Sequence, residues 1–405
     1  MKKWIIIVIC SCSLLSYSQE LARKYESGLQ KMQKQDYTGA ITDFTSIINQ
    51  SAYYFDAYLQ RGICYEHINK NDLAIADYNE AIKQNPKYVE AYYQRALFYA
   101  SIQKDTQRAI SDLSSVLKIK NRNYAAYEIR GQLYLCRHKY MQAKEDFSAA
   151  IALKNNWIPL IGRAKANYYM DDLPATISDC EAVIKEKADC AEAFFVRAMA
   201  KEKMAMFIEA GKDYNKAVAL GLKTPEVIQA RANMYYSTMQ YKLAWNDYND
   251  LLMNYKIKTA ENYCRRGVCY TALNDSLKAK RDFSQALLLD KNNYLIFLYK
   301  AENSTKLKHY HVALDDYRRA LELNSKGWDV YYSRAKLYME MERYQEAIAD
   351  FDIVLKRNEK NAEAYYLRGS CKDFIRDYEG ACADLQAAAA LYHQTAIERV
   401  KKYCN

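Results

Sequence analysis

The stretch "AYLQRGICYEHINKNDLAIADYNEAI", which runs from Ala57 to Ile82, decides the fold because a close copy of it occurs far along the chain. The second copy, "AYYLRGSCKDFIRDYEGACADLQAAA", runs from Ala364 to Ala389. Both begin with Ala-Tyr, continue with Arg-Gly, and then place an alanine four residues before a bulky residue. A chain that returns to one pattern over such a distance is expected to consist of copies of one structural unit.

The copies form a continuous series between these two stretches. A small residue, usually preceded by arginine, recurs eleven times at intervals of 33 to 35 residues. These small residues are Gly28, Gly62, Ala96, Gly131, Ala164, Ala198, Ala232, Gly267, Ala301, Ala335 and Gly369. A second small residue follows each after twelve or thirteen positions, and a bulky residue comes four positions later. Eleven repeats at one period predict a stacked array rather than two or three globular domains.

Each repeat contains two stretches with helical periodicity. In the first, Tyr58 and Tyr65 lie four residues before and three residues after the small residue, on one face of a helix with 3.6 residues per turn. In the second, Ala74, Tyr78 and Ala81 follow the same spacing. The small residues allow two helix backbones to approach, and the large rings fill the space beside them. We therefore predict an all-α protein built from helix–turn–helix units.

The composition agrees with this prediction. The chain has 405 residues, is 50% hydrophobic, and contains only 11 glycines and 4 prolines, which is too few for a loop-rich sheet protein. The formal charge of +10 is spread along the chain, with lysines and arginines often beside acidic residues. Nucleic-acid binding usually requires a dense basic stripe, and the sequence has none. We therefore expect no nucleic-acid partner.

The first 18 residues are typical of a secretory signal peptide. Lys2 and Lys3 precede an apolar run that is too short to cross a bilayer, and cleavage after Ser18 would leave Gln19 first. Lipid attachment at Cys12 is an alternative interpretation of the same segment. No other apolar run is long enough to form a transmembrane segment. We expect export, with a periplasmic or secreted location, or a lipid anchor in the alternative case.

The repeat resembles the tetratricopeptide repeat, a 34-residue helix–turn–helix with a small residue at position 8, alanine at position 20 and an aromatic residue at position 24. The resemblance covers about residues 21–395, although Thr176 and Cys180 depart from the pattern in the fifth repeat. It implies an all-α, right-handed superhelical solenoid. We predict an array of about eleven repeats over residues 19–395, followed by a charged capping helix over residues 396–405.

Two charged residues recur in the repeat. An arginine precedes the first small residue in nine repeats, and an aspartate precedes the bulky residue in all eleven. A row of charged ligand sites is one interpretation of this pattern. However, both positions flank the seam between the two helices, so we predict structural Arg–Asp pairs. In particular, we expect Arg231 to contact an aspartate.

The cysteines do not indicate a disulfide framework. Nine remain after Ser18, which is an odd number, and their spacing is irregular. Cys64, Cys269 and Cys371 share repeat position 10, where we expect them to act as small apolar residues. A disulfide between Cys371 and Cys382, across the two helices of the last repeat, is left open.

No motif for catalysis or metal binding emerges. His309 and His311 are two residues apart, so on a helix their side chains would point in different directions. The sequence lacks a glycine-rich phosphate loop, a Gly-x-Ser-x-Gly elbow and a His-Glu-x-x-His motif. We predict no catalytic residues, no cofactor and no metal, and therefore a protein that is not an enzyme.

The resemblance also implies where a partner would bind. Tetratricopeptide arrays have a concave groove lined by the first helices, with positions 2, 5, 9, 12 and 13 exposed. Tyrosine suits peptide binding there because it offers a large contact area with few torsions to freeze. Packing of the same rings against neighbouring repeats is the alternative. The candidate partner-binding residues are Tyr25, Tyr93, Lys165, Tyr168, Tyr169, Phe195, Asn233, Tyr236, Glu302, Tyr332, Lys336 and Tyr366.

The lysine and asparagine clamp of chaperone-binding family members is not carried over, because no repeat combines lysine at position 5 with asparagine at position 9. We predict a non-catalytic scaffold or adaptor, exported to the cell envelope, that binds a protein or peptide in its groove. A structural or polysaccharide-binding component of the envelope is the alternative. The sequence names neither the partner nor the oligomeric state.

Overall fold

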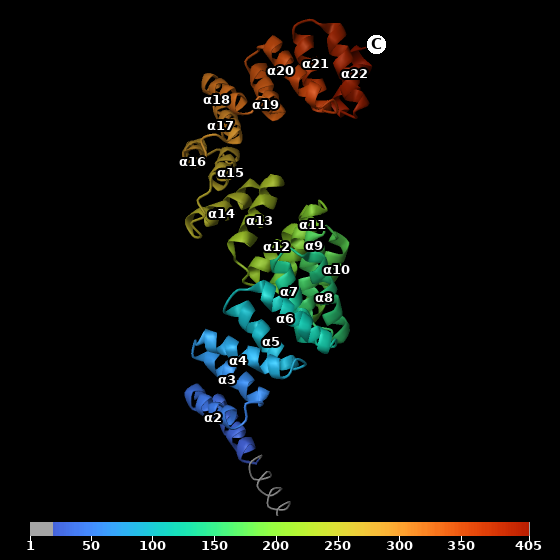
Figure 1. Ribbon diagram of the computed structural model, residues 1–405. Coiled ribbons are helices and arrows are strands. Elements are labelled where there is room, and N and C mark those ends of the chain that lie inside the picture. The colour runs from blue at the N-terminus through green and yellow to red at the C-terminus, as the bar shows by residue number, and fades with distance from the viewer. Residues whose placement is uncertain (1–18, 405) are drawn as a thin grey trace, which may run out of the picture. The chain divides into compact units, whose positions relative to one another are not determined.

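The computed structural model describes residues 19–404, and every regular element within this range is a helix (Figure 1). The predicted signal peptide and the alternative lipid attachment at Cys12 lie outside the described residues. None of the helices between residues 19 and 404 has both the length and the apolar character needed to cross a membrane. The chain divides into two compact units, residues 19–206 (unit 1) and residues 207–404 (unit 2), so the division falls within the sixth repeat.

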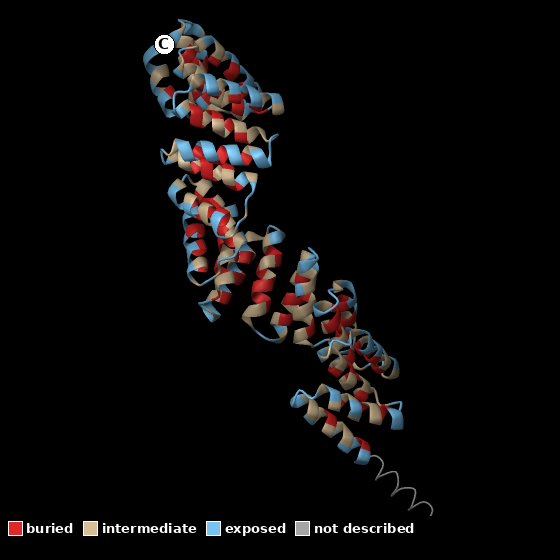
Figure 2. Ribbon diagram, turned by 90° about the vertical axis from the view of Figure 1, so that its left-hand side faces the viewer, coloured by how far each residue is buried: buried red, intermediate tan, exposed pale blue. Residues whose placement is uncertain are grey.

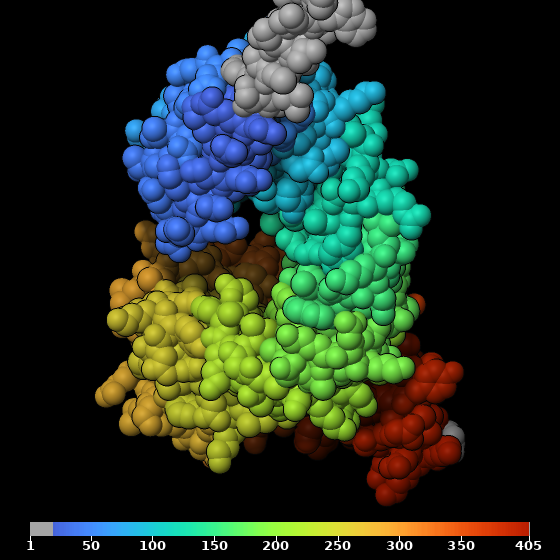
Figure 3. Space-filling model, turned by 90° about the horizontal axis from the view of Figure 1, so that it is seen from below, coloured from blue at the N-terminus to red at the C-terminus, as the bar shows by residue number. Residues whose placement is uncertain are grey.

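Unit 1 begins with a helix over residues 19–33. Its further helices are α2 (Tyr37–Gln50), α3 (Phe55–His67), α4 (Asn71–Gln84), α5 (Val89–Ser101), α6 (Thr106–Ile119), α7 (Tyr124–Cys136), α8 (Tyr140–Leu153), α9 (Trp157–Tyr169), α10 (Leu173–Glu186) and α11 (Ala191–Lys203). First and second helices of the repeats alternate along the unit. In the space-filling view of Figure 3, its repeats follow one another in a curved row from blue to green.

Unit 2 continues the same alternation. Its helices are α12 (Phe207–Ala219), α13 (Pro225–Ser237), α14 (Tyr241–Met253), α15 (Ala260–Ala272), α16 (Ser276–Leu289), α17 (Tyr294–Lys306), α18 (Tyr310–Leu323), α19 (Trp328–Glu340), α20 (Tyr344–Arg357), α21 (Ala362–Phe374), α22 (Tyr378–Ala390) and α23 (Gln394–Tyr403). Here the odd-numbered helices up to α21 are first helices of repeats, and α23 follows the last repeat.

The turn between the two helices of a repeat reverses the chain with one residue of positive φ. In the second repeat this residue is Asn69, with φ of 59°, and the backbone N–H of Lys70 donates to the carbonyl of Tyr65. This hydrogen bond closes the end of the first helix. The same backbone conformation recurs at Gln35, Asn69, Lys104, His138, Asp171, Ala205, Met239, Asn274, Lys308, Glu342 and Arg376. Most of these residues are neither glycine nor asparagine, so residue type gave little warning of the conformation.

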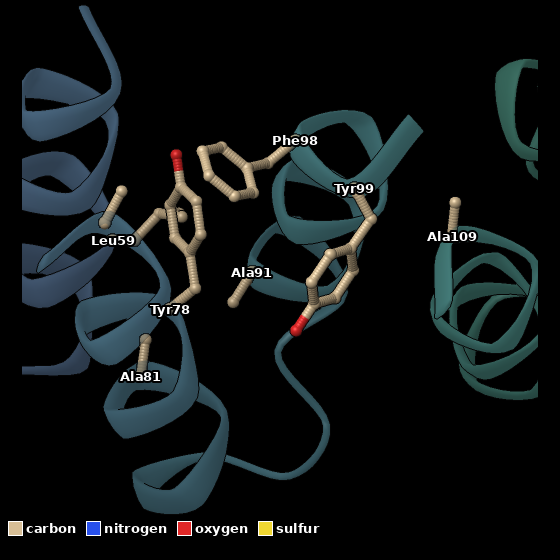
Figure 4. Close-up of a cluster of buried hydrophobic side chains, with 8 residues drawn as sticks. Leu59, Tyr78, Ala81, Ala91, Phe98, Tyr99 and Ala109 are labelled. Carbon is tan, nitrogen blue, oxygen red and sulfur yellow. The ribbon is translucent and has the colours of Figure 1, made fainter. Parts of the chain in front are cut away.

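Within each unit, the core lies between paired helices and extends from one repeat into the next, as the buried residues in Figure 2 show. Figure 4 shows the cluster that joins the second and third repeats. The fully buried ring of Tyr78 on α4 packs beside Leu59 of its own repeat and meets the edge of Phe98 on α5, with ring centroids 6.1 Å apart. Its hydroxyl donates to Glu66 over 2.8 Å. The bulky residue Tyr78 therefore packs against its own repeat and against the next one.

The predicted Arg–Asp pairs are confirmed along the seam between first and second helices. In each pair the arginine Nε and Nη2 donate to the two carboxylate oxygens, over 2.5 to 2.9 Å. The pairs of this form are Arg61–Asp77, Arg95–Asp112, Arg130–Asp146, Arg163–Asp179, Arg231–Asp247, Arg266–Asp282, Arg334–Asp350 and Arg368–Asp384. Two parallel hydrogen bonds between charged partners fix both distance and orientation.

The seam arginine also connects neighbouring repeats. Arg61 Nη1 donates to Thr45, and Arg231 Nη1 donates to Asn215, in each case on the second helix of the preceding repeat. The guanidinium of Arg61 lies against the rings of Tyr58 and Tyr65, at 5.5 and 5.7 Å from their centroids. These contacts place the tyrosine-rich positions of the first helix around a buried cation.

The ninth repeat shows what the seam loses without an arginine. There Lys300 occupies the arginine position and donates one hydrogen bond, of 2.6 Å, to Asp316 Oδ1. The second oxygen, Oδ2, is buried without a hydrogen-bond partner. An ammonium group makes one point contact where a guanidinium would make two.

The C-terminal end differs from the expectation. Helix α23 begins two residues before the expected start, and Cys404 at its end forms a disulfide with Cys382 of α22, with Cα atoms 5.5 Å apart. The pairing of Cys371 with Cys382, left open from the sequence, is therefore wrong. Cys371 is a free thiol, fully buried in a cluster with Phe351 and Val354 of the preceding repeat.

Candidate binding face on the first helices

The first helices of successive repeats contact one another within each unit. In unit 1, α7 and α11 both contact α9, and in unit 2, α15 and α19 both contact α17. We call the surface formed by these helices the first-helix face. The predicted partner-binding residues are spread over both units, so each unit is described separately.

Near the start of unit 1, two predicted tyrosines are partly buried. The edge of Tyr25 packs on Phe44, with ring centroids 5.7 Å apart, and Tyr25 also lies 5.7 Å from the ring of Tyr54. Tyr93 on α5 lines an open depression between its own helix and the start of α7, beside Asn123. Tyr25 thus packs mainly within the array, whereas Tyr93 borders an accessible surface.

On α9 and α11, the predicted residues lie among charged neighbours. Lys165 forms an ion pair with Glu192 on α11, and both side chains are partly exposed. Phe195 on α11 is partly buried. The Lys165–Glu192 pair joins two first helices.

Tyr168 and Tyr169 are the last two residues of α9. The ammonium of Lys203 lies 4.6 Å from the ring centroid of Tyr168. Tyr169 stacks on Tyr140 of α8, with ring centroids 4.8 Å apart, and remains 58% exposed. The rings serve contacts within unit 1, and one face of Tyr169 stays open to solvent.

At the end of unit 2, the cap uses a predicted binding residue. Tyr366 on α21 stacks on His393, with ring centroids 4.4 Å apart, and the guanidinium of Arg399 on α23 lies 5.8 Å from its centroid. Arg399 also pairs with Asp373 of α21 at 2.9 Å, which reinforces this contact. Tyr366 therefore holds the capping helix.

In the middle of unit 2, two predicted residues lie beside Arg265, and one of them, Tyr236, borders a cavity. Asn233 and Tyr236 on α13 meet Arg265 on α15, whose Nη1 donates to Asn233 Oδ1 over 2.7 Å. The guanidinium lies 5.4 Å from the Tyr236 ring centroid. Tyr236 and Arg265, with Glu261 and Tyr299, border a cavity of about 210 Å³, which we call the Tyr236 cavity.

A second cavity lies one helix farther along the face. It has a volume of about 300 Å³ and lies between α17 and α19, with Tyr317 of α18 at one wall. We call it the Glu302 cavity. Its polar lining consists of Glu302, Thr305, Lys306, Tyr317, Ser333, Lys336 and Glu340. Both cavities are lined by α17, where Tyr299 and Glu302 lie three residues apart and so on one face of the helix.

The electrostatics of the two cavities differ. Burial raises the pKa of Tyr236, and the neighbouring Tyr299 adds to the shift, so its hydroxyl stays protonated. Burial also raises the pKa of the Glu302 carboxyl, against the opposing effects of a hydrogen bond from Ser333 and of nearby Lys336. Ser333 Oγ donates to Glu302 Oε1 over 2.8 Å. The ammonium of Lys336 lies over the ring of Tyr332, 5.7 Å from its centroid.

Sequence reasoning missed several residues of these cavities. Arg265 stands at repeat position 6, which is outside the exposed positions used for the prediction, and Tyr299 shares that position. The available signal was the dipeptide Arg265-Arg266, in which only the second arginine belongs to the seam. Glu340 stands at position 13, one of the exposed positions, but was not selected, and Ser333 at position 6 gave no signal of its own.

Potentially reactive and metal-binding side chains were considered among the described residues. Burial raises the pKa of the thiols of Cys64, Cys264, Cys269 and Cys371 to about 12, so these thiols stay protonated near neutral pH. Among residues 19–404, no group of three or more potential ligands from histidine, cysteine, aspartate and glutamate could hold a metal ion.

Comparison with protein families assigns the repeats. Models of the tetratricopeptide repeat match residues 55–88, 77–111, 260–293 and 332–399. The chain is a tetratricopeptide repeat protein. The first match begins at the first residue of α3 and includes all of α4, so the matched unit is one helix pair. Tetratricopeptide repeat proteins typically mediate protein–protein interactions, and members of the family are generally non-catalytic scaffolds.

One solved structure supports the fold, and a second is reported beside it. A tetratricopeptide repeat protein from Parabacteroides merdae is 22% identical, covers 62% of this chain and 99% of its own, and superimposes with a TM-score of 0.53. The structure of YrrB, described as a tetratricopeptide repeat protein with an unusual peptide-binding site, is 16% identical. It covers 47% of this chain and 98% of its own, with a TM-score of 0.45. No curated protein matches this tetratricopeptide repeat protein.

Proposed function

We propose that this tetratricopeptide repeat protein is an exported, non-catalytic scaffold that binds a segment of a partner protein on the first-helix face of unit 2. The observation that carries the proposal is the pair of cavities along α17, which are lined by tyrosine and charged side chains. Aromatic rings with polar tips give large contact area together with directional hydrogen bonds. The resemblance to a secretory signal in the first 18 residues supports the export.

The binding test compares three baits made from residues 19–405 in envelope extracts of the source cells. The first is the wild type, the second carries Arg265→Ala and Tyr332→Ser, and the third carries Arg318→Ala and Tyr53→Ser. Arg318 and Tyr53 are 68% and 87% exposed, and neither lies on the first-helix face, so the third bait is a matched control. We expect proteins that are held by the first and third baits and lost by the second.

Equal capture by all three folded baits would contradict binding on this face. Capture that disappears at high salt in the wild type would instead favour a charge-driven contact with an anionic envelope polymer, because screening weakens contacts between exposed charges. A contact that depends on aromatic rings should persist.

Export has its own test. The mature protein should be recovered outside the cytoplasm with Gln19 as its first residue. A lipid-modified protein beginning at Cys12, recovered with membranes, would establish the alternative attachment. An uncleaved protein in the cytoplasm would overturn the proposed export.

A further inference from the structure

The turns of the seventh, eighth and ninth repeats, all in unit 2, expose large apolar side chains. These turns and the first residues of α14, α16 and α18 cover residues 238–243, 273–280 and 307–312, which we call the turn edge. Six apolar side chains on the turn edge are 40% to 79% exposed, namely Met239, Leu243, Leu273, Leu277, Leu307 and Val312. Exposed apolar side chains that gather on one surface indicate a contact with something else.

The three turns adjoin one another. Trp245 of α14 packs edge-on against Tyr270, near the end of α15, with ring centroids 5.9 Å apart. Lys306, the last residue of α17, donates from Nζ to the carbonyl of Thr271 on α15 over 2.7 Å. Because the turns begin where these first helices end, the exposed apolar side chains lie along one edge of unit 2.

Lysines accompany the apolar side chains. The turn edge contains four lysines, no arginine and one aspartate. The aspartate, Asp275, pairs with Lys278 at 2.6 Å. Lys242, Lys280 and Lys308 are exposed, and among residues 19–404 none of the three has a carboxylate oxygen within 4 Å. The turn edge therefore carries positive charge that the fold does not neutralise.

The next repeat shows that the turn itself does not require this combination. The corresponding residues 341–346 contain two glutamates and one arginine. Arg343 pairs with Glu346 at 2.6 Å, and the side chain of Met341 is partly buried. Within unit 2, exposed apolar side chains together with unpaired lysines are thus a feature of the turn edge and not of every repeat.

This combination of side chains favours one kind of occupant. Two copies of the chain in contact through this edge would bring their lysines together, and like charges repel. A soluble polyanion would attract the lysines but leave the leucines in water. An anionic bilayer accommodates both, because apolar side chains enter the boundary between headgroups and acyl chains while lysine ammonium groups stay at the headgroups.

We propose that the turn edge docks unit 2 on the surface of an anionic phospholipid bilayer. Met239 and Leu277, which are 74% and 79% exposed, enter the interface. Lys242 and Lys280 lie against the headgroup phosphates. The contact adds a membrane-binding surface to the partner-binding face and does not depend on it.

The test measures sedimentation of residues 19–405 with lipid vesicles. Omitting the first 18 residues removes an apolar run that would obscure the result. We expect binding to vesicles of phosphatidylcholine and phosphatidylglycerol in equal parts, and none to phosphatidylcholine alone. A variant with Lys242→Gln and Lys280→Gln should bind the mixed vesicles roughly 25-fold more weakly, about fivefold for each lysine. A variant with Met239→Asn and Leu277→Ser should bind them about tenfold more weakly.

The matched control carries Met253→Ser and Leu288→Ser. These residues lie at the other ends of α14 and α16 and are 56% and 78% exposed. The control should bind the mixed vesicles as the wild type does. Far-UV circular dichroism shows that each variant is still helical, so weak binding cannot be mistaken for misfolding.

No binding to the mixed vesicles, or an equal loss in the control, would overturn the proposal. Full binding by the variant with Met239→Asn and Leu277→Ser would also overturn it, because the contact would then be one that any polyanion could make. Self-association without vesicle binding would assign the turn edge to a second copy of the chain. The vesicles contain no partner protein, so this result and that of the capture experiment can fail separately.

Discussion

The helix seam and the Glu302 cavity both hold carboxylates in unit 2, but they surround them differently. In the seam of the seventh repeat, Asp247 receives two hydrogen bonds from Arg231, whose Nη1 donates to Asn215. In the cavity, Glu302 receives a hydrogen bond from the hydroxyl of Ser333. Among the described residues, the aspartate at the joint between two helices therefore has an arginine ion pair. Glu302, which lines a cavity on the first-helix face, has a hydroxyl donor instead.

The largest expected effect comes from breaking the seam. Asp247→Ala should lower the free energy of unfolding by about 3–5 kcal/mol, because it leaves the buried Arg231 cation without its carboxylate. The side chains of this pair are 6% and 16% exposed, so solvent screens the charges little. Urea denaturation, with hydrogen exchange of α13 and α14, measures the loss.

The matched control is the exposed pair of Asp315 and Arg318, whose side chains are 73% and 68% exposed. Asp315→Ala should change stability by no more than about 1 kcal/mol. If the two alanine variants were equally stable, burial of the seam pair would not be what distinguishes it.

The second effect concerns the eleventh repeat, against which α23 packs and to which a disulfide joins it. Cys404→Ser should lower local stability by about 3 kcal/mol, because the disulfide closes a loop with a sequence separation of 22 residues. The loss should be confined to α22 and α23, since a repeat contacts only its neighbours. Hydrogen exchange resolves this, with Cys136→Ser at an exposed free thiol as the control.

Unchanged protection of α23 in Cys404→Ser would mean that noncovalent contacts suffice. The candidates are the hydrogen bond between His393 and Glu363, of 2.8 Å, and the pair of Arg399 with Asp373.

A third, smaller effect is expected from completing the hydrogen bonds of the seam in the ninth repeat. Lys300→Arg should raise the free energy of unfolding by about 1–3 kcal/mol, because a guanidinium can reach the buried Oδ2 of Asp316, which now lacks a partner. Chemical denaturation compares this variant with Lys300→Gln, which removes the charge and should destabilise. A destabilised arginine variant would show that the space beside Asp316 cannot hold the larger group.

The smallest expected effect is a gain in stability at the cavity, whereas breaking the seam lowers stability. Glu302→Gln should raise the free energy of unfolding by roughly 1 kcal/mol at neutral pH, because the amide needs no desolvated charge. The pKa of Glu302 is raised in the folded state, mainly by burial. As the pH falls through that raised pKa, the folded carboxyl takes up a proton before the unfolded one does, so its destabilising contribution disappears.

The stability difference between wild type and Glu302→Gln should therefore shrink as the pH falls. Lys336 limits its size and Asp329 increases it. Unfolding curves at a series of pH values measure the difference. A difference that stays constant with pH, or a variant that is less stable than wild type at neutral pH, would contradict the view that Glu302 is held against a cost.

Features that recur along the repeats could be predicted from the sequence, whereas features found in a single repeat were missed. The seam pairs follow from helical spacing alone, since Arg231 and Asp247 each flank the inward stripe of a regular helix. The Glu302 cavity depends on Ser333 and Glu340, which occur in one repeat and leave no column in the alignment. Tyr236, Glu302 and Lys336 were predicted to be on the binding face, but their places in two cavities required the packing of α13 to α19.

The disulfide was missed for a related reason. Cys404 lies beyond the repeats, so the period gives no position for it. Cys371 shares a column with Cys64 and Cys269, and all three are buried as small apolar residues, as the column predicted. Cys382 was left to pair with the cysteine nearest in the repeat pattern rather than with the one that α23 brings to it.

Seven seam arginines donate a hydrogen bond to the preceding repeat, and this has a consequence for how such a gene grows. Arg231 finds its acceptor on α12, and Arg130 finds Ser114 on α6, so donor and acceptor belong to different copies. A duplication that copied one interior repeat would add one arginine and one acceptor together. Both junctions of the inserted copy would then be satisfied, and the lineage could lengthen the protein by whole repeats without leaving a buried charge unmatched.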